Sequence, residues 1–488
     1  MINPKKLSLN KKIAFGCADI FGGGAFNLMN FLYPAYAAIT LGLGAGLAGT
    51  IILVARFWDA LIDPIIGQIS DRTRSKFGKR RIYFLIGAPL IVLSLLLAFF
   101  PWGFDSKGAK FVIALLCYML FYTVQSFIMI PYYSLSSEIS ADYTERAKAN
   151  TIRLSFSIFS SILCVVLPNI IVSTINNSTN SSNGYIVMSI VFGIIFAVPL
   201  IFTAFFSKEE IVTPPNKEKF SVKLFFQPVK NKAFRKYLGM QMCNGFSMAV
   251  MSGLFFFFVN YVIKADVTAA NGGQGPFLGM LAAGLMFAMQ IIALPFYLKL
   301  IKTKNKSYAY VIGSIIWISV ALSLFFVPKN LSDSLNWIVI ILAALIGFGV
   351  SGPALVPHTM VGDINDACEI QFGIRKEGAV SGILNFINQL TQALGVGVVM
   401  WVLQFCGFTE PQAGEIAVLA QPASAQTALM CFMALTPLII MTIGIVISVR
   451  YKIDKKKQSE MVNFLEKQRT TENFDSLEEE RSILLKSL

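Results

Sequence analysis

Apolar runs long enough to cross a membrane dominate the chain. A bilayer core of ~30 Å needs about 20 apolar residues per helix, and the 488-residue sequence contains twelve such runs. The predicted spans are residues 13–41, 44–69, 82–102, 110–139, 149–175, 185–206, 236–263, 275–300, 307–327, 336–361, 379–406 and 425–449. The pattern therefore predicts an all-α membrane protein with twelve transmembrane helices.

The polar segments divide these spans into two sets of six. We predict an N-terminal six-helix bundle (1–206), a cytoplasmic central loop (207–235), a C-terminal six-helix bundle (236–450) and a cytoplasmic tail (451–488). Lys and Arg concentrate in alternate loops and near both termini, whereas residues 176–184 contain neither. Basic residues collect on the cytoplasmic side, so we expect both termini there. This layout resembles the major facilitator fold, in which two bundles rock around a midplane site.

Composition supports a membrane protein and excludes other classes. The chain is 55% hydrophobic and 14% charged, whereas soluble domains carry about 25% charged residues. Its net charge of +14 comes from residues between apolar segments, which fits the positive-inside rule and gives no reason to expect a nucleic-acid partner. We expect an integral protein of the plasma (inner) membrane that functions as a monomer in the lipid bilayer.

The sequence has no group of residues spaced like a catalytic triad or a metal site. Its seven cysteines are scattered without a CxxC pair, and its single histidine, His358, follows Pro357 in an apolar span. We interpret the cysteines as buried small hydrophobes and His358 as a structural residue. We therefore expect neither an enzyme nor a cofactor.

The second span contains three charged residues, Arg56, Asp59 and Asp63. At 1.5 Å and 100° per residue, both acids lie near mid-depth and all three side chains fall within an arc of about 60°. Each such charge costs roughly 2.5 kcal/mol or more in the bilayer. One interpretation is an ion pair that joins helices. The other is a cation site, where paired carboxylates bind Na⁺ or accept H⁺ because neighbouring like charges resist double ionisation.

Further polar stripes lie in three other spans. Ser126 offers a hydroxyl oxygen to a small cation, and Arg153 is placed to face a cavity or an acid. The other stripe residues have side chains that stack on or hydrogen-bond a polar ligand, or that pack and bond between helices. They are Tyr122, Gln125, Met129 and Tyr133 in the fourth span, and Ser381, Asn385, Asn388, Gln389 and Gln392 in the eleventh.

Two motifs resemble one transporter family. Residues 58–81, "WDALIDPIIGQISDRTRSKFGKRR", fit the pattern W-D-A-x-x-D-P-x-x-G-x-x-x-D-R-T-x-S-x-x-G-K of the glycoside–pentoside–hexuronide:cation symporters, which include melibiose permeases. Residues 363–378, "DINDACEIQFGIRKEG", are similar to the family's acidic loop ahead of the eleventh helix. The shorter stretches "ERAKANTIR" and "NKAFRK" also fit.

This resemblance implies roles for individual residues. Asp59 and Asp63 match the cation-binding aspartates, and Ser126 stands where a hydroxyl residue assists them. Arg153 matches a sugar-site arginine, and Tyr133 replaces a tryptophan of the melibiose carriers. The same comparison suggests that the cytoplasmic loops contribute gating residues, which are Asp71, Arg72, Arg375 and Glu377.

The chain departs from the melibiose carriers at three positions. Gly23 and Met129 replace two sugar-contacting acids, and Gln389 replaces a lysine, so the charge of the cavity stays roughly balanced. Asp19 fits an acid of other members and joins the expected substrate residues. We expect a Na⁺- or H⁺-coupled secondary transporter of a glycoside or related sugar, working by alternating access. The alternative is a major facilitator carrier of a more amphipathic substrate, such as a lysolipid.

Overall fold

The computed structural model describes residues 7–139, 143–179, 183–207, 226–270, 277–373, 377–409, 421–470 and 475–487, and these are helical with no strand among them. The N-terminal helices are α1 (Leu9–Gly16), α2 (Asp19–Ala35), η1 (Tyr36–Thr40), α3 (Gly44–Arg72), α4 (Arg81–Ala98), α5 (Lys107–Glu138), α6 (Tyr143–Thr179) and α7 (Asn183–Phe206). They pack mainly on one another, through α2 with α6, α4 with α7, and α3 with α5.

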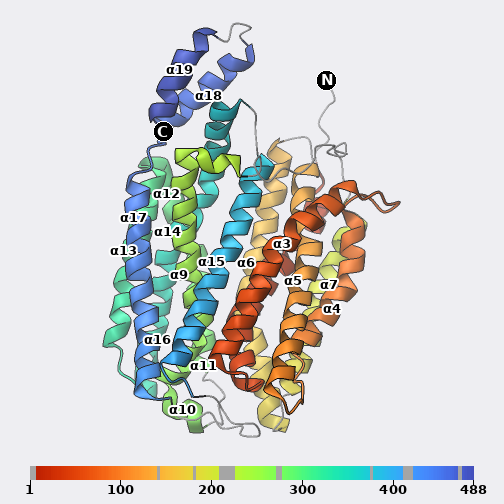
Figure 1. Cartoon of the computed structure of the whole chain (residues 1–488), viewed down its shortest axis with the longest axis vertical. Coiled ribbons are helices and arrows are strands. Elements are labelled where there is room, and N and C mark those ends of the chain that lie inside the picture. The colour runs from red at the N-terminus through yellow and green to blue at the C-terminus, as the bar shows by residue number, and fades with distance from the viewer. Residues whose placement is uncertain are drawn as a thin grey trace.

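The C-terminal helices form a second group beside the first (Figure 1). They are η2 (Gln227–Lys230), α9 (Lys232–Phe258), η3 (Val259–Ile263), α10 (Ala265–Ala270), α11 (Phe277–Ile292), α12 (Leu294–Thr303), α13 (Lys306–Ser323), η4 (Leu324–Phe326), η5 (Asp333–Leu335), α14 (Asn336–Phe372), α15 (Glu377–Phe405), α16 (Ala423–Thr436), η6 (Pro437–Met441) and α17 (Thr442–Val449). The tail adds α18 (Lys455–Thr470) and α19 (Asp475–Ser487).

Eleven of the described helices are long and apolar enough to cross a membrane. The first predicted span, 13–41, supplies the twelfth crossing but differs from the others. It is divided at residues 17–18 into α1 and α2 and ends in the π-helix η1. It also buries three polar side chains, Asp19, Asn27 and Asn30, which lower its hydropathy. These polar side chains therefore lie in the protein interior rather than against lipid.

The tenth span is longer than predicted. The acidic stretch 363–372, which we expected to be a loop, continues α14 as far as Phe372. Asp363 is tolerated there because Lys306 of α13 pairs with it at 2.5 Å, Nζ to Oδ2. The helix ends at Gly373, whose φ of +73° places it in the left-handed region that favours glycine.

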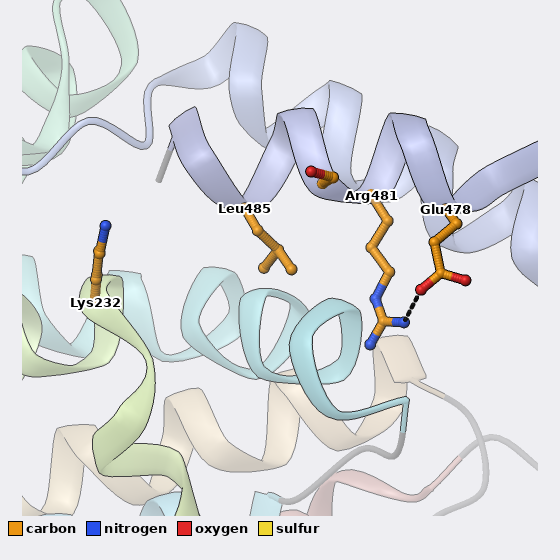
Figure 2. Close-up of a pocket in the computed structure, with 5 residues that line it drawn as sticks. Lys232, Glu478, Arg481 and Leu485 are labelled. Atoms are coloured by element: carbon orange, nitrogen blue, oxygen red, sulfur yellow. Dashed lines mark ion pairs between the residues drawn. The ribbon is translucent and has the colours of Figure 1, made fainter.

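The tail folds back on the end of α14. Arg481 of α19 donates from Nε to the Ile370 carbonyl at 2.8 Å and from Nη2 to the Gln371 carbonyl at 2.9 Å. Met461, Phe464 and Leu465 of α18 are buried in this contact region. Figure 2 shows the adjoining pocket of about 450 Å³, lined by Lys232, Glu478, Arg481, Ser482 and Leu485. We name this side of the molecule the tail end and the opposite side, near α10, the loop end (Figure 1).

Candidate ion and substrate site

Two carboxylates and one hydroxyl converge at mid-depth between α3 and α5. Ser126 Oγ lies 2.7 Å from Asp59 Oδ1 and 2.5 Å from Asp63 Oδ1. Asp59 is buried and Asp63 is half-buried. The helical spacing of four residues places both acids on the face of α3 that packs on α5. The structure thus brings together the three residues predicted as the cation site.

This cluster is short of one positive charge or proton. A serine hydroxyl has a single hydrogen and can donate to one carboxylate at a time, yet two carboxylate oxygens lie within hydrogen-bonding distance of it. A monovalent cation, or a proton shared by the acids, satisfies the second contact. No group of three or more His, Cys, Asp or Glu side chains among the described residues fits a metal ion. The hydroxyl of Ser126 and the carboxylates of Asp59 and Asp63 are oxygen ligands of the kind that a small monovalent cation accepts.

Arg56 lies one turn before Asp59 and is 3% exposed. Its Nη2 donates to Asn30 Oδ1 of α2 at 2.8 Å, and its guanidinium lies 4.3 Å from the centre of the Tyr122 ring. Stacking on an aromatic face is a favourable arrangement for a buried guanidinium. Tyr122 thus contacts Arg56 beside the acid pair, and its predicted contact with substrate stays a prediction.

Gln389 links the acid pair to the other bundle. Its Nε2 donates to Asp63 Oδ2 at 2.7 Å across the contact between α3 and α15, which is the most extensive contact between two of the described helices. The same antiparallel contact continues toward the loop end, where Trp401 Nε1 donates to Thr50 Oγ1 at 2.9 Å. The candidate ion site thus lies directly on the boundary between the two bundles.

A second charged cluster lies nearer the tail end. Arg153 of α6 pairs with Asp19 of α2 at 3.7 Å, Nε to Oδ2, and its guanidinium lies 5.6 Å from the centre of the Tyr133 ring. The Tyr133 side chain is 47% exposed, whereas Asp19 is buried. The structure thus brings together Arg153, Asp19 and Tyr133, which were predicted as substrate residues, with Tyr133 open to solvent.

The glycine at position 23 has a steric explanation. A Cβ at Gly23 would lie 2.7 Å from the carbonyl oxygen of Ser157, so α2 and α6 are too close there for any larger residue. Met129 extends its methyl group toward Gly22, beside Asp19.

For several predicted site residues, the structure does not describe the position of the side chain. Asp71, Arg72, Glu377, Ser381 and Asn385 lie on described helices, but their side chains are outside the described part of the structure, and Arg375 lies outside it entirely. Gln125 is described on α5, and its buried Oε1 has no hydrogen-bond partner within the described residues. Their predicted roles remain predictions.

His358 on α14, interpreted as structural, has an exposed side chain, and this interpretation stays a prediction. Sequence reasoning did not single out Gln241 and Asn244 on α9, whose buried amide oxygens have no hydrogen-bond partner among the described residues. The signal in the sequence was the polar pair at spacing three inside an otherwise apolar helix, which resembles the amide stripe predicted in the eleventh span.

The two bundles meet closely at the loop end. A Cβ at Gly49 of α3 would lie 2.7 Å from the Gly397 carbonyl oxygen of α15, a backbone approach that small residues permit. The Phe31 ring of α2 lies 5.9 Å from that of Phe256 on α9 and 5.7 Å from that of Phe287 on α11. Val166 of α6 fills the space beside Gly284 of α11. These contacts join the two bundles at the loop end.

This geometry, with paired acids at the boundary of two bundles, agrees with a comparison against known proteins. Residues 14–455 match the model of the MFS/sugar transport protein family. The chain belongs to this family. It is therefore an integral membrane transporter rather than an enzyme, and the resemblance to the glycoside–pentoside–hexuronide:cation symporters is confirmed.

Individual relatives show the range of the family. The putative glycoside/cation symporter YagG of Escherichia coli (strain K12) is 26% identical and covers 89% of this chain and 90% of its own length. The isoprimeverose transporter of Lactiplantibacillus pentosus is 23% identical, with coverages of 97% and 94%. The sodium-dependent lysophosphatidylcholine symporter 1-B of Danio rerio is 22% identical, with coverages of 96% and 91%.

The fold agrees with a solved transporter. A structure from a study of substrate recognition in proton-dependent oligopeptide transporters matches with a TM-score of 0.63 over 91% of this chain and 99% of that one. Sequence identity is 13%, so the likeness concerns the fold alone.

Proposed function

We propose that the protein is a cation-coupled symporter of a glycoside or related sugar in the plasma (inner) membrane, with both termini cytoplasmic. The coupling ion, Na⁺ or H⁺, binds Asp59, Asp63 and Ser126. The substrate binds in the cavity lined by Asp19, Tyr133 and Arg153. No resident cofactor takes part.

The observation that carries this proposal is the contact of one serine hydroxyl with two carboxylates, completed by Gln389 from the opposite bundle. A charged side chain at the centre of the bilayer costs several kcal/mol unless it faces a polar or water-filled site. A cation between the acids removes the repulsion between their negative charges. It also leaves Asp63 Oδ2 free to accept the hydrogen bond from Gln389. Ion binding therefore favours one relative position of the two bundles, which is the condition for coupling.

The substrate class follows from the second cluster and from relatives. A guanidinium offers a rigid fork of donors to neighbouring hydroxyls, and the Asp19 carboxylate accepts from them. The names of the Escherichia coli and Lactiplantibacillus pentosus relatives refer to glycosides or sugars. A second candidate substrate, a lysolipid, is favoured only by the zebrafish relative.

Transport by purified protein in liposomes tests the proposal. An inward Na⁺ gradient and an inward H⁺ gradient are imposed separately, and labelled neutral glycosides and lysophosphatidylcholine are supplied in turn. We expect a glycoside to accumulate with one of the gradients. Accumulation of lysophosphatidylcholine alone would select the second candidate, and uptake that ignores both gradients would refute ion coupling.

A further inference from the structure

The cavity side of the C-terminal bundle carries amides and no charge. Residues 237–263, in α9 and η3, contain no Asp, Glu, Lys or Arg, and neither do residues 378–409, in and after α15. In their place, buried amide oxygens of Gln241, Asn244, Gln389 and Gln392 have no hydrogen-bond partner within the described residues. An unpartnered buried polar group costs about 1–3 kcal/mol, so such groups in one region indicate a ligand or ordered water.

Asn244 faces the opposite bundle. It lies eleven residues before Phe255 on α9, which at 100° per residue puts both on nearly the same face. The Phe255 ring lies 6.4 Å from the ring of Phe31 on α2, so this face is directed toward the N-terminal bundle. Gln241, one turn earlier, is held by its Nε2, which donates to Asn388 Oδ1 at 3.1 Å.

Gln392 faces the same region from α15. It follows Gln389 by three residues, less than one turn, and Gln389 reaches Asp63 across the bundle boundary. Leu394, two residues further, is exposed and lies on the opposite, lipid-facing side of the helix. Gln392 and Asn244 therefore face the space between the bundles from neighbouring helices, since α9 and α15 pack together.

The charges on the other wall determine what ligand fits. The N-terminal bundle places Asp19, Asp59 and Asp63 with Arg56 and Arg153 around the cavity. Three carboxylates and two guanidinium groups sum to −1 when all are ionised. One monovalent cation brings this sum to zero, whereas an anionic substrate would return it to −1. An uncompensated charge at this depth costs several kcal/mol.

We propose that Asn244, Gln241 and Gln392 form a second subsite that binds hydroxyl groups of a neutral glycoside, so that the substrate contacts both bundles. The inference rests on the proposed function and narrows its substrate class to uncharged sugars. Amides suit this task because each both donates to and accepts from hydroxyls. A ligand that contacts both bundles also stabilises their closed arrangement.

Binding to purified protein at saturating Na⁺ or H⁺ tests this subsite. The probes are matched pairs that differ only in a carboxylate, namely methyl glucosides with methyl glucuronides and methyl galactosides with methyl galacturonides. Melibiose and cellobiose serve as neutral disaccharides. We expect wild-type protein to bind neutral members and to prefer each over its charged partner by tenfold or more.

Two variants then examine the residues themselves. Asn244→Leu and Gln392→Met remove the amides at similar size, and each should weaken binding of the preferred neutral probe roughly tenfold. Cation-induced thermal stabilisation should stay unchanged, which confirms folding. Asn169→Leu is the matched control, because the Asn169 amide bonds the Val165 carbonyl of its own helix.

The outcomes separate the two proposals. If wild-type protein binds neutral glycosides but both variants bind them equally well, the subsite is wrong while the proposed function stands. A preference for the glycuronide partners would overturn the charge argument in the same way. If no glycoside of the panel binds, the proposed function fails and the subsite with it.

Discussion

Gln389 donates a hydrogen bond to Asp63 across 326 residues of sequence, with 2.7 Å between Nε2 and Oδ2. The donor belongs to the C-terminal bundle and the acceptor to the proposed ion site of the N-terminal bundle. A proton or cation at Asp63 would change the strength of this bond, because ionised acceptors form stronger hydrogen bonds than neutral ones. This one contact therefore connects the proposed ion site physically to the position of the bundles.

Neutralising either acid should abolish coupling. Asp59→Asn and Asp63→Asn each remove a ligand and half of the negative charge of the pair, so no accumulation should remain under an imposed cation gradient. Gradient-driven uptake into liposomes measures this. Asp105→Asn, in an exposed loop, is the control and should transport as wild type does. Wild-type accumulation by either variant would contradict the assignment of the cation site.

A lysine at position 389 should remove the need for a cation. Gln389→Lys places an ammonium group beside Asp63 and brings the charge sum of the cavity to zero, so we expect no gradient-driven uptake. Substrate binding with and without the coupling cation measures the effect. Gln389→Met adds no charge, so it should still bind the coupling cation although it loses the amide that contacts Asp63. If cation dependence persists in the lysine variant, position 389 does not act on the ion site.

Arg153 should matter for substrate more than for the ion. Arg153→Lys keeps the charge that pairs with Asp19 but loses the planar fork, so substrate affinity should fall by about 1–3 kcal/mol. Cation affinity should not change. Equilibrium binding at saturating cation measures both, and Arg74→Lys in the exposed loop provides the control. An unchanged substrate dissociation constant would mean that Arg153 serves only as a partner for Asp19.

A larger residue at Gly397 should open the loop end. Its Cβ would already lie 3.0 Å from Leu53 Cβ and 3.1 Å from the Gly49 carbonyl oxygen, so Gly397→Val forces α3 and α15 apart. Closure of this end should become unfavourable by roughly 1–3 kcal/mol. The readout is alkylation of a cysteine placed at Met400, which is buried at this contact, with Cys406 replaced by serine, and the rate should rise at least about fivefold.

The control for that experiment is Gly103→Val, because nothing lies within 4 Å of a Cβ at Gly103. It should leave the alkylation rate unchanged. Equal rates in the Gly397 variant and the wild type would mean that the two glycines do not determine closure of the loop end.

The sequence predicted elements and local groupings better than contacts between distant helices. Asp59, Asp63 and Arg56 share one helical face, so their proximity follows from spacing alone. The Gln389–Asp63 bond depends on the register of α3 against α15, which no local pattern specifies. The extension of α14 was missed because its acidic residues resembled a loop, whereas Asp363 is neutralised by Lys306 from another helix.

The hydrogen bond from Trp401 to Thr50 makes Trp401 an intrinsic fluorescence reporter of the contact between the two bundles. The chain has five tryptophans, and the indole of Trp401 donates at 2.9 Å to a residue of the other bundle. Indole emission depends on hydrogen bonding and polarity around the ring, so separation of α3 from α15 changes its spectrum. The proposed alternation between conformations would thus be observable by intrinsic fluorescence in unlabelled protein, with Trp401→Phe identifying the responding ring.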